Sequence, residues 1–206
     1  MPKPFQLARG VTVSDLAGIH EGYSMAVAPK GHTVFTVNVS AERLGEVFRR
    51  LSAEVVEPGF LLLETGTHES VEKTLRKSAT DPFHKDVYYL DRITHADLLG
   101  ILGRHGELLV QDGGINFGFG SGTGIDEVFV GPYKVVYIYA DAPEKYVRAL
   151  EESGFGREPQ LRTVWENFTQ ESPGSRHVLT DVATTIQDLI AELESEGLYL
   201  AERRED

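Results

Sequence analysis

Short runs of β-branched and aromatic residues recur along both halves of the chain and predict β-strands. The two longest runs are HTVFTVNV at 32–39 and YKVVYIYA at 133–140. A helical stretch follows each of them, and then a second apolar run, FLLLE at 60–64 or TVWE at 163–166. Short strands or extended links are predicted at 87–90 and 177–179, and closing strands at 107–111 (ELLVQ) and 198–202 (LYLAE).

Apolar residues spaced three and four positions apart predict two helices in each half. The first helix has an apolar stripe from Leu44 to Leu51, and Ser40 is its expected N-cap, with a hydroxyl that accepts from a free backbone N–H. Its counterpart in the second half starts after Asp141 and ends at Gly154, since glycine adopts the left-handed conformation without a Cβ clash.

The second helix of each half is expected just before the closing strand. Thr94 and Asp97 form a capping-box-like start in the first half, and Gly106 is the expected stop. In the second half, the apolar stripe from Ile186 to Leu193 predicts the helix and Gly197 its end. Each half therefore has the order β-β-α-β-(β)-α-β, which predicts an α+β fold with mixed sheet or sheets and helices packed on one face.

The two halves also resemble one another in sequence. Residues 59–70 align with 161–172 at an offset of 102, and residues 97–112 align with 188–203 at an offset of 91. Hydrophobic periodicity does not explain the shared polar pattern E-x-x-T-x-E-S, so we predict a tandem duplication with units 1–112 and 113–206 about a pseudo-two-fold axis, as two units or one fused domain. The alternative is that two generic strand-helix-strand patterns look alike because amphipathic elements share their periodicity.

The net charge of the chain limits the classes of molecule that it can bind. The chain has 20 Lys and Arg against 32 Asp and Glu, a formal net charge of −12, which repels nucleic acids and anionic membranes. An acidic surface that binds favours basic proteins or cations. A local basic insert with Lys73, Arg76, Lys77 and Lys85 is predicted as an exposed helix and loop, with a docking element as the alternative.

Cysteine usage and hydropathy suggest the compartment. The chain has no cysteine, which is compatible with a reducing environment, and no apolar stretch reaches the length of a signal peptide or of a membrane span. We therefore expect a cytoplasmic protein.

Motifs for cofactors and covalent catalysis are missing. The glycine-rich stretch DGGINFGFGSGTG at 112–124 matches neither the P-loop nor the dinucleotide-binding spacing, so it predicts a strand at 115–119 and a flexible turn, and we expect no cofactor. Ser, His and Asp are present without a G-x-S-x-G elbow, which leaves a hydrolase triad unsupported.

Two sets of residues were candidates for chemistry, both derived from the repeat. His20 and Glu21 correspond to Asp126 and Glu127, and a pseudo-dyad that joined their loops would gather one imidazole and three carboxylates suited to a divalent cation. The competing interpretation is four solvated turn residues.

The second set follows the predicted strands at 60–64 and 163–166. Glu64 and Glu69 correspond to Glu166 and Glu171, with Thr67 and Thr169 between them, and paired carboxylates can act as general acid and base. The competing interpretation is that these residues serve as turn and helix-cap groups.

Aromatic residues are candidates for binding anchors, because Tyr and Trp dominate protein interfaces. The candidates are Tyr88, Tyr89, Trp165, Phe168 and Tyr199. Trp165 aligns with a leucine in the other unit, and the predicted strand around it favours burial.

Charge and the missing catalytic motifs together favour a non-catalytic acidic protein-binding module, such as an immunity-type antagonist, a regulator or an adaptor of a basic protein. The alternative is an enzyme or a small-ligand or divalent-cation binder, with a carboxylate-lined site between the two units. A third hypothesis is that the protein forms a homo-oligomer through an unpaired sheet edge.

Overall fold

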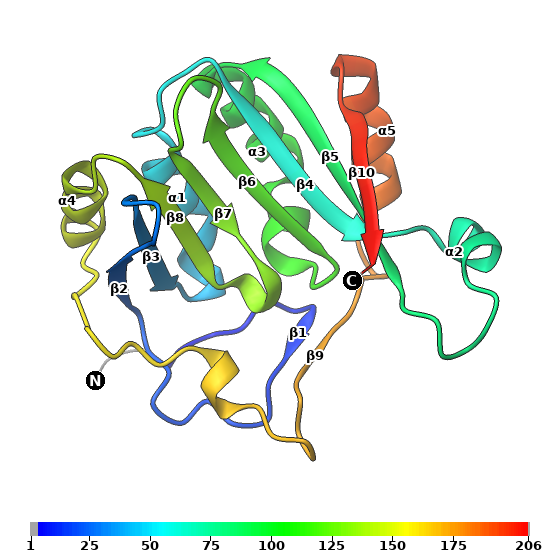
Figure 1. Cartoon of the computed structure of the whole chain (residues 1–206), viewed down its shortest axis with the longest axis horizontal. Helices are drawn as coiled ribbons and strands as arrows, with labels where there is room; N and C mark the ends of the chain where they lie inside the picture. Colours follow the sequence, from blue (N-terminus) through cyan, green and yellow to red (C-terminus); the bar gives the residue numbers. More distant parts are fainter. Residues whose placement is uncertain (1–3, 206) are drawn as a thin grey trace.

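The computed structural model describes residues 4–205, and its central feature is one antiparallel sheet (Figure 1). Within that range the sheet has eight strands in the order β10-β5-β4-β6-β7-β8-β3-β2. A separate two-stranded sheet joins β1 (Val11–Thr12) to β9 (Ser175–Arg176). The bounds of the eight strands are β2 Gly22–Val27, β3 Thr33–Asn38, β4 Gly59–Gly66, β5 His84–Ile93, β6 Ile115–Ser121, β7 Glu127–Val130, β8 Val136–Ala140 and β10 Tyr199–Glu205.

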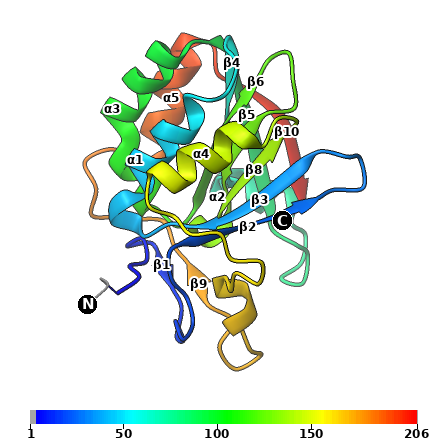
Figure 2. The same ribbon diagram turned by 90° about the vertical axis from the view of Figure 1, so that its left-hand side faces the viewer.

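Four helices cover one face of this sheet and leave the other face without a helix, as the side view shows (Figure 2). They are α1 (Ala41–Ser52), α3 (His95–Gln111), α4 (Glu144–Glu152) and α5 (Ile186–Glu196). The short helix α2 (Glu69–Leu75) stands away from the sheet at the end of β4 (Figure 1). None of the helices within residues 4–205 has both the length and the apolar character needed to cross a lipid bilayer.

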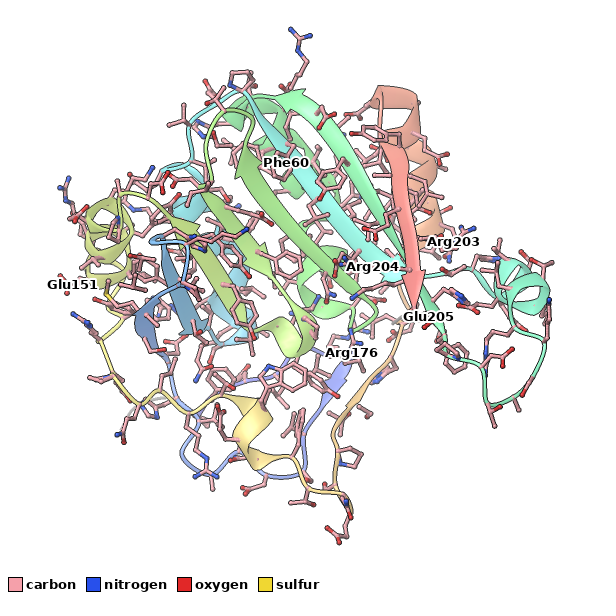
Figure 3. The ribbon with its side chains drawn as sticks, in the orientation of Figure 1. Phe60, Glu151, Arg176, Arg203, Arg204 and Glu205 are labelled. Atoms are coloured by element: carbon pink, nitrogen blue, oxygen red, sulfur yellow. The ribbon has the colours of Figure 1, made fainter. Side chains whose placement is uncertain are left out.

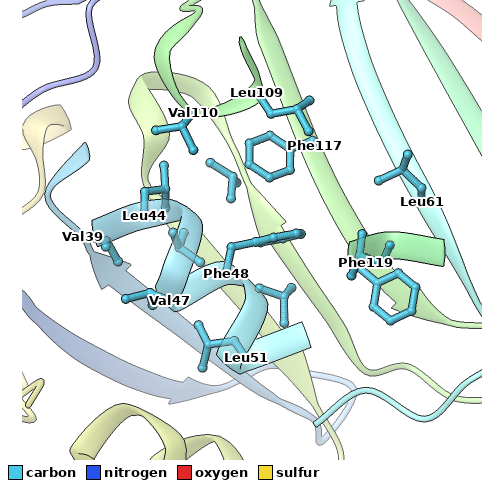
Figure 4. Close-up of a cluster of buried hydrophobic side chains, with 14 of the residues drawn as sticks. Val39, Leu44, Val47, Phe48, Leu51, Leu61, Leu109, Val110, Phe117 and Phe119 are labelled. Atoms are coloured by element: carbon cyan, nitrogen blue, oxygen red, sulfur yellow. The ribbon is translucent and has the colours of Figure 1, made fainter. Parts of the chain in front are cut away.

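The hydrophobic core fills the space between the helices and the sheet (Figure 4). Phe48 of α1 packs edge-on against Phe117 of β6, with ring centroids 4.8 Å apart, and both side chains are buried. Leu61 and Leu63 of β4 point to the same side because alternate residues of a strand share a face. Each such side chain contributes roughly 1.5–3 kcal/mol through burial, so one face of each amphipathic element is fixed toward this layer.

The α+β class is confirmed, and several helix ends are as expected. Thr94 and Asp97 form a full capping box at the start of α3. Gly197 ends α5 in the left-handed conformation, with φ of +112°. Ser40 is the N-cap of α1, but its hydroxyl accepts from the backbone N–H of Gln6 rather than from the helix.

Two predicted strands are wrong, and one of the segments predicted as a strand or a link is a link. Residues 163–166 belong to the 3-10 helix η2 (Val164–Asn167), because Thr163 and Glu166 form a capping box that starts a helical turn. Residues 107–111 are the last turns of α3, which continues through Gly106 and buries its apolar residues on the helix's inner side. Residues 177–179, predicted as a short strand or an extended link, form a link after β9.

Every ladder of the eight-stranded sheet is antiparallel, although the connections include crossovers. Helix α1 joins β3 to β4, and α3 joins β5 to β6; each of these pairs runs in the same direction with other strands between them. The crossovers led us to expect both parallel and antiparallel pairing. In the described residues, parallel pairing is limited to an isolated bridge between Tyr23 and Arg157.

Strands from 1–112 and from 113–206 interleave in this one sheet. Strand β10 lies beside β5, β6 beside β4, and β8 beside β3. The segments β2-β3-α1 and β7-β8-α4 share their order of elements, whereas η2 stands where a second copy of β4 was expected. The tandem duplication itself stays a prediction.

Candidate functional site

The four residues of the candidate cation site lie apart. His20 and Glu21 precede β2, whereas Asp126 and Glu127 are at the start of β7. Because β2 and β7 run in opposite directions in the antiparallel sheet, the ends at which they begin are opposite ends of the sheet. Among residues 4–205, no group of three His, Asp or Glu side chains is placed to hold a metal ion.

Three of these four residues have local partners instead. The His20 imidazole contacts Glu158, with 2.5 Å between Nε2 and Oε1, and the hydrogen bond and charge of Glu158 raise the pKa of His20 despite its partial burial. Glu21 is paired with Arg43, and Asp126 with Lys145. Glu127 differs from the other three, because its side chain lies on the sheet face away from the helices.

The second candidate set is also divided. Glu64 in β4 and Glu69 in α2 line the same cavity, whereas Glu166 is the capping residue of η2 and Glu171 is exposed in the following turn. The division follows from the missing strand at 163–166, since Glu166 then has no position equivalent to Glu64. Thr67 donates its hydroxyl hydrogen to Asp86, at 2.6 Å.

The cavity lies at the end of β4 and the start of β6 and has a volume of about 720 Å³. Glu64 enters it with its carboxylate already occupied. Arg204 donates to Glu64 at 2.7 Å and Asn116 at 3.2 Å, and the Lys85 ammonium lies 3.9 Å away. Three neighbours on one carboxylate favour a structural role for Glu64 over that of a general acid.

Lys134 is buried beside this cavity. Its ammonium donates to the carbonyl of Leu109 in the last turn of α3, at 2.8 Å, and to that of Ile115 in β6, at 2.7 Å. It thereby satisfies a helix carbonyl that lacks an intrahelical partner. Burial lowers the pKa of Lys134 to about 7, against the opposing charge of Asp112.

This lowered pKa predicts a pH-dependent stability. Between the folded pKa of about 7 and the ordinary lysine pKa of 10.5, the unfolded chain retains the lysine proton and the folded chain releases it. The free energy of unfolding then rises with pH, by roughly 2 kcal/mol between pH 7 and pH 9. Urea unfolding of the wild type and of Lys134→Met at both pH values measures this increment, which we expect to disappear in the variant. Equal increments in the two proteins would show that Lys134 stays charged when folded.

The face of the sheet without helices, which we call the open face, carries aromatic side chains. Core residues such as Leu61, Phe117 and Ile138 point to the helices, so their neighbours along each strand point to the opposite side. Figure 3 views this side, with Phe60 labelled near the middle of the sheet. The aromatic side chains on it come from five strands: Phe60, Tyr89, Phe129, Tyr137, Tyr139 and Tyr199.

Strand register arranges these residues in two adjacent rows. The first row crosses the sheet through Phe60, Gly120, Glu127 and Tyr139. The second row runs through Tyr199, Tyr89, Leu62, Gly118, Phe129 and Tyr137. A ring contact links the rows, since the ring centroids of Phe60 and Tyr89 lie 5.4 Å apart. Within the second row, the ring centroids of Tyr89 and Tyr199 lie 6.5 Å apart.

Two glycines of β6 give the rings room. A Cβ on Gly120 would lie 2.3 Å from a carbon of the Phe60 ring, and one on Gly118 would lie 3.1 Å from the Phe129 ring. The rings therefore reach across β6 at positions where a side chain would displace them. The glycine spacing in residues 112–124 was the sequence signal for this arrangement, although it predicted a strand and a turn.

Glu127 is the acidic group of the first row, where it lies between Gly120 and Tyr139. Its side chain is partly buried, and within residues 4–205 no hydrogen bond or ion pair reaches its carboxylate. Burial raises the pKa of Glu127, and repulsion from Glu64 raises it further. An unpartnered carboxylate among aromatic rings has unused capacity for a positive group.

A further aromatic cluster lies where η1 (Pro132–Lys134) meets η2. Tyr133 contacts Trp165 and Phe168, with ring centroids 4.8 Å and 4.7 Å away. Trp165 was expected to be buried in a strand, but it is 42% exposed because its segment forms η2. Of the five aromatic anchor candidates, Tyr89 and Tyr199 lie on the open face, whereas Tyr88 points to the helix layer and is buried.

No family model, curated protein or solved structure matches this chain.

Proposed function

We propose that this protein is a non-catalytic binding module that docks a basic protein on its open face. The observation that carries the proposal is the composition of that face, where six aromatic side chains surround carboxylates. In an antiparallel sheet, a face turned to water normally alternates polar residues outward. Contiguous aromatic residues on such a face are typical of an interaction surface, and Tyr is enriched among the residues that dominate binding energy.

Charge supports a basic partner. The net charge of −12 gives the protein a negative field that speeds the approach of cationic proteins and slows that of polyanions. The role corresponds to an immunity-type antagonist, a regulator or an adaptor of a basic protein. A cytoplasmic setting belongs to the same proposal, since a chain without cysteine is compatible with a reducing compartment.

Affinity capture with matched variants tests the proposal. The face variant carries Phe129→Ala and Tyr139→Ala, and the control carries Leu99→Ala, which removes a 53% exposed apolar side chain from α3. We expect the wild type and the control to retain the same basic protein from the source lysate, and the face variant to lose it. Binding measured with the purified partner should weaken steeply as salt rises.

Unchanged retention by the face variant, with its melting temperature close to that of the wild type, would contradict docking on the open face. Retention of an acidic partner, or an affinity insensitive to salt, would contradict the charge argument.

The cavity at the end of β4 favours a second candidate, a small-ligand binder. Its lining joins Glu64 and Lys85 from the first half of the chain to Asn116, Arg176 and His177 from the second. A mixed set of charged and amide groups suits a small polar molecule. A thermal-shift screen of amino acids and sugars tests this role: a ligand that stabilises the wild type but not Asn116→Leu would support it, and a screen without any shift would count against it.

A further inference from the structure

We infer that Glu127 is the point at which the open face receives an arginine side chain of the partner. The inference rests on the proposed function and names the chemical group that the face holds. It assigns a role to the carboxylate that lies between Phe60 and Tyr139 in the first row.

The position of the Glu127 side chain supports this assignment. The Oε1 atom of Glu127 lies 3.4 Å from the site of a Cβ built on Gly118, so the carboxylate lies over β6. Tyr139 is its direct neighbour on β8, and Phe60 stands across Gly120 on the other side. A group bound to this carboxylate would therefore have an aromatic ring on either side.

The lack of a cationic partner for Glu127 in the described residues also supports the assignment. Other acidic side chains of comparable burial have a cation: Asp86 has Arg203, Asp126 has Lys145 and Glu21 has Arg43. Glu127 lacks one within the described chain, while its burial and the nearby Glu64 both oppose its charge. A cation supplied from outside would relieve that cost, because a partly desolvated carboxylate gains more from an opposite charge than a solvated one does.

Chemistry selects arginine among cations. A metal ion needs several ligands, and residues 4–205 contain no group of three or more acidic or imidazole side chains placed to hold one. A guanidinium is planar and weakly hydrated, forms paired hydrogen bonds with a carboxylate, and stacks on aromatic rings. Lysine has the charge without the plane, so we expect it to bind more weakly at this position.

Three short peptides test the inference directly: acetyl-Gly-Arg-Gly-amide, its citrulline analogue and its lysine analogue. Citrulline keeps the shape of arginine and removes the charge. Titrations followed by NMR shifts of the tyrosine and phenylalanine rings give each dissociation constant. We expect arginine to bind with a constant on the order of 1 mM, citrulline to bind at least about tenfold more weakly, and lysine to fall between them.

Two variants locate the effect. Glu127→Gln keeps the size of the side chain and should weaken arginine binding about tenfold, which corresponds to the loss of a charge-assisted contact. Glu171→Gln removes an exposed carboxylate from a distant turn and should leave binding unchanged. Because Glu127 has no partner to lose, we expect the Glu127→Gln variant to melt at or above the wild-type temperature. Such a melting temperature would show that the variant is folded.

The outcomes separate the inference from the proposed function. Equal affinities for the arginine and citrulline peptides, or no effect of Glu127→Gln, would overturn the arginine assignment. If the alanine substitutions at Phe129 and Tyr139 still abolish capture of the basic partner in that case, the open face remains the docking surface. Capture that survives those substitutions would overturn the proposed function, whatever the peptides show.

Discussion

Replacement of Gly113 by alanine is expected to destabilise the protein by more than about 3 kcal/mol, or to prevent folding. Three backbone segments meet at this glycine. The Gly113 N–H donates to the carbonyl of His177 at 3.1 Å, and the His177 N–H donates to that of Gly10 at 2.9 Å. A Cβ on Gly113 would lie 1.8 Å from the Gly10 carbonyl oxygen, which is backbone and has no side-chain rotation to move it away.

The effect on function follows from what Gly113 positions. It lies two residues before β6, the strand whose glycines support the aromatic rows, and it joins that strand to the segments around Gly10 and His177. Urea unfolding measures the loss. Gly103→Ala is the matched control, since Gly103 lies exposed within α3 with open space at its Cβ position, and the same substitution there should stabilise by about 0.5–1 kcal/mol. Similar stabilities for the two variants would contradict the close approach of the Gly113 and Gly10 backbones.

Replacement of Asp86 by alanine is expected to cost about 3 kcal/mol and to loosen β10 from β5. Arg203 of β10 donates twice to the Asp86 carboxylate, at 2.6 Å and 2.8 Å, and Thr67 donates at 2.6 Å. Burial opposes the charge of Asp86, but the bonds from Arg203 and Thr67 outweigh it and lower the pKa. Removing the carboxylate leaves a partly buried guanidinium and a threonine hydroxyl without their acceptor.

Urea unfolding and hydrogen exchange of the β10 amides measure the two consequences. The stabilisation should be present above the ordinary pKa of aspartate and be lost as pH falls through the lowered value. A double-mutant cycle of Asp86→Ala, Arg203→Ala and the double variant isolates the interaction between the two side chains. We expect a coupling free energy of about 1.5–3 kcal/mol. Exchange in β10 that is unchanged in Asp86→Ala would show that Tyr199 and the backbone ladder hold the edge strand without the ion pair.

Local pattern was sufficient to predict much of the fold. The run at 32–39 formed β3 and the run at 133–140 formed β8, because β-branched residues alternate between two environments in each. Thr94 and Asp97 specified the start of α3 through hydrogen bonds within four residues. Such features are readable because all their partners are neighbours in sequence.

The failures came from competition between local patterns. TVWE has the composition of a strand, yet the Thr163 and Glu166 capping box turned it into η2. ELLVQ also resembles a strand, but α3 had no strong stop at Gly106, and Lys134, 25 residues further on, satisfies the carbonyl of Leu109 near its end. A distant residue thus fixed a boundary that the local sequence left open.

The candidate surface depended on information that the sequence lacks. Alternation divides each strand into two sides, but the order of strands and the placement of helices decide which side stays uncovered. Glu127 was identified as a candidate, with His20 and Asp126 as its expected neighbours. Its actual neighbours, Phe60 and Tyr139, come from β4 and β8 and are brought to it by the sheet.

Photo-crosslinking shows which face of the sheet contacts the basic partner. Benzoylphenylalanine placed at Thr36, which lies beside Tyr137 on the open face, should crosslink to the captured basic protein. The same group placed at Leu99, on the exposed side of α3, should not. We expect a covalent product from position 36 alone, and we expect raised salt to suppress it. A product from position 99 with none from position 36 would show that the partner binds the helices and that the open face is not the docking surface.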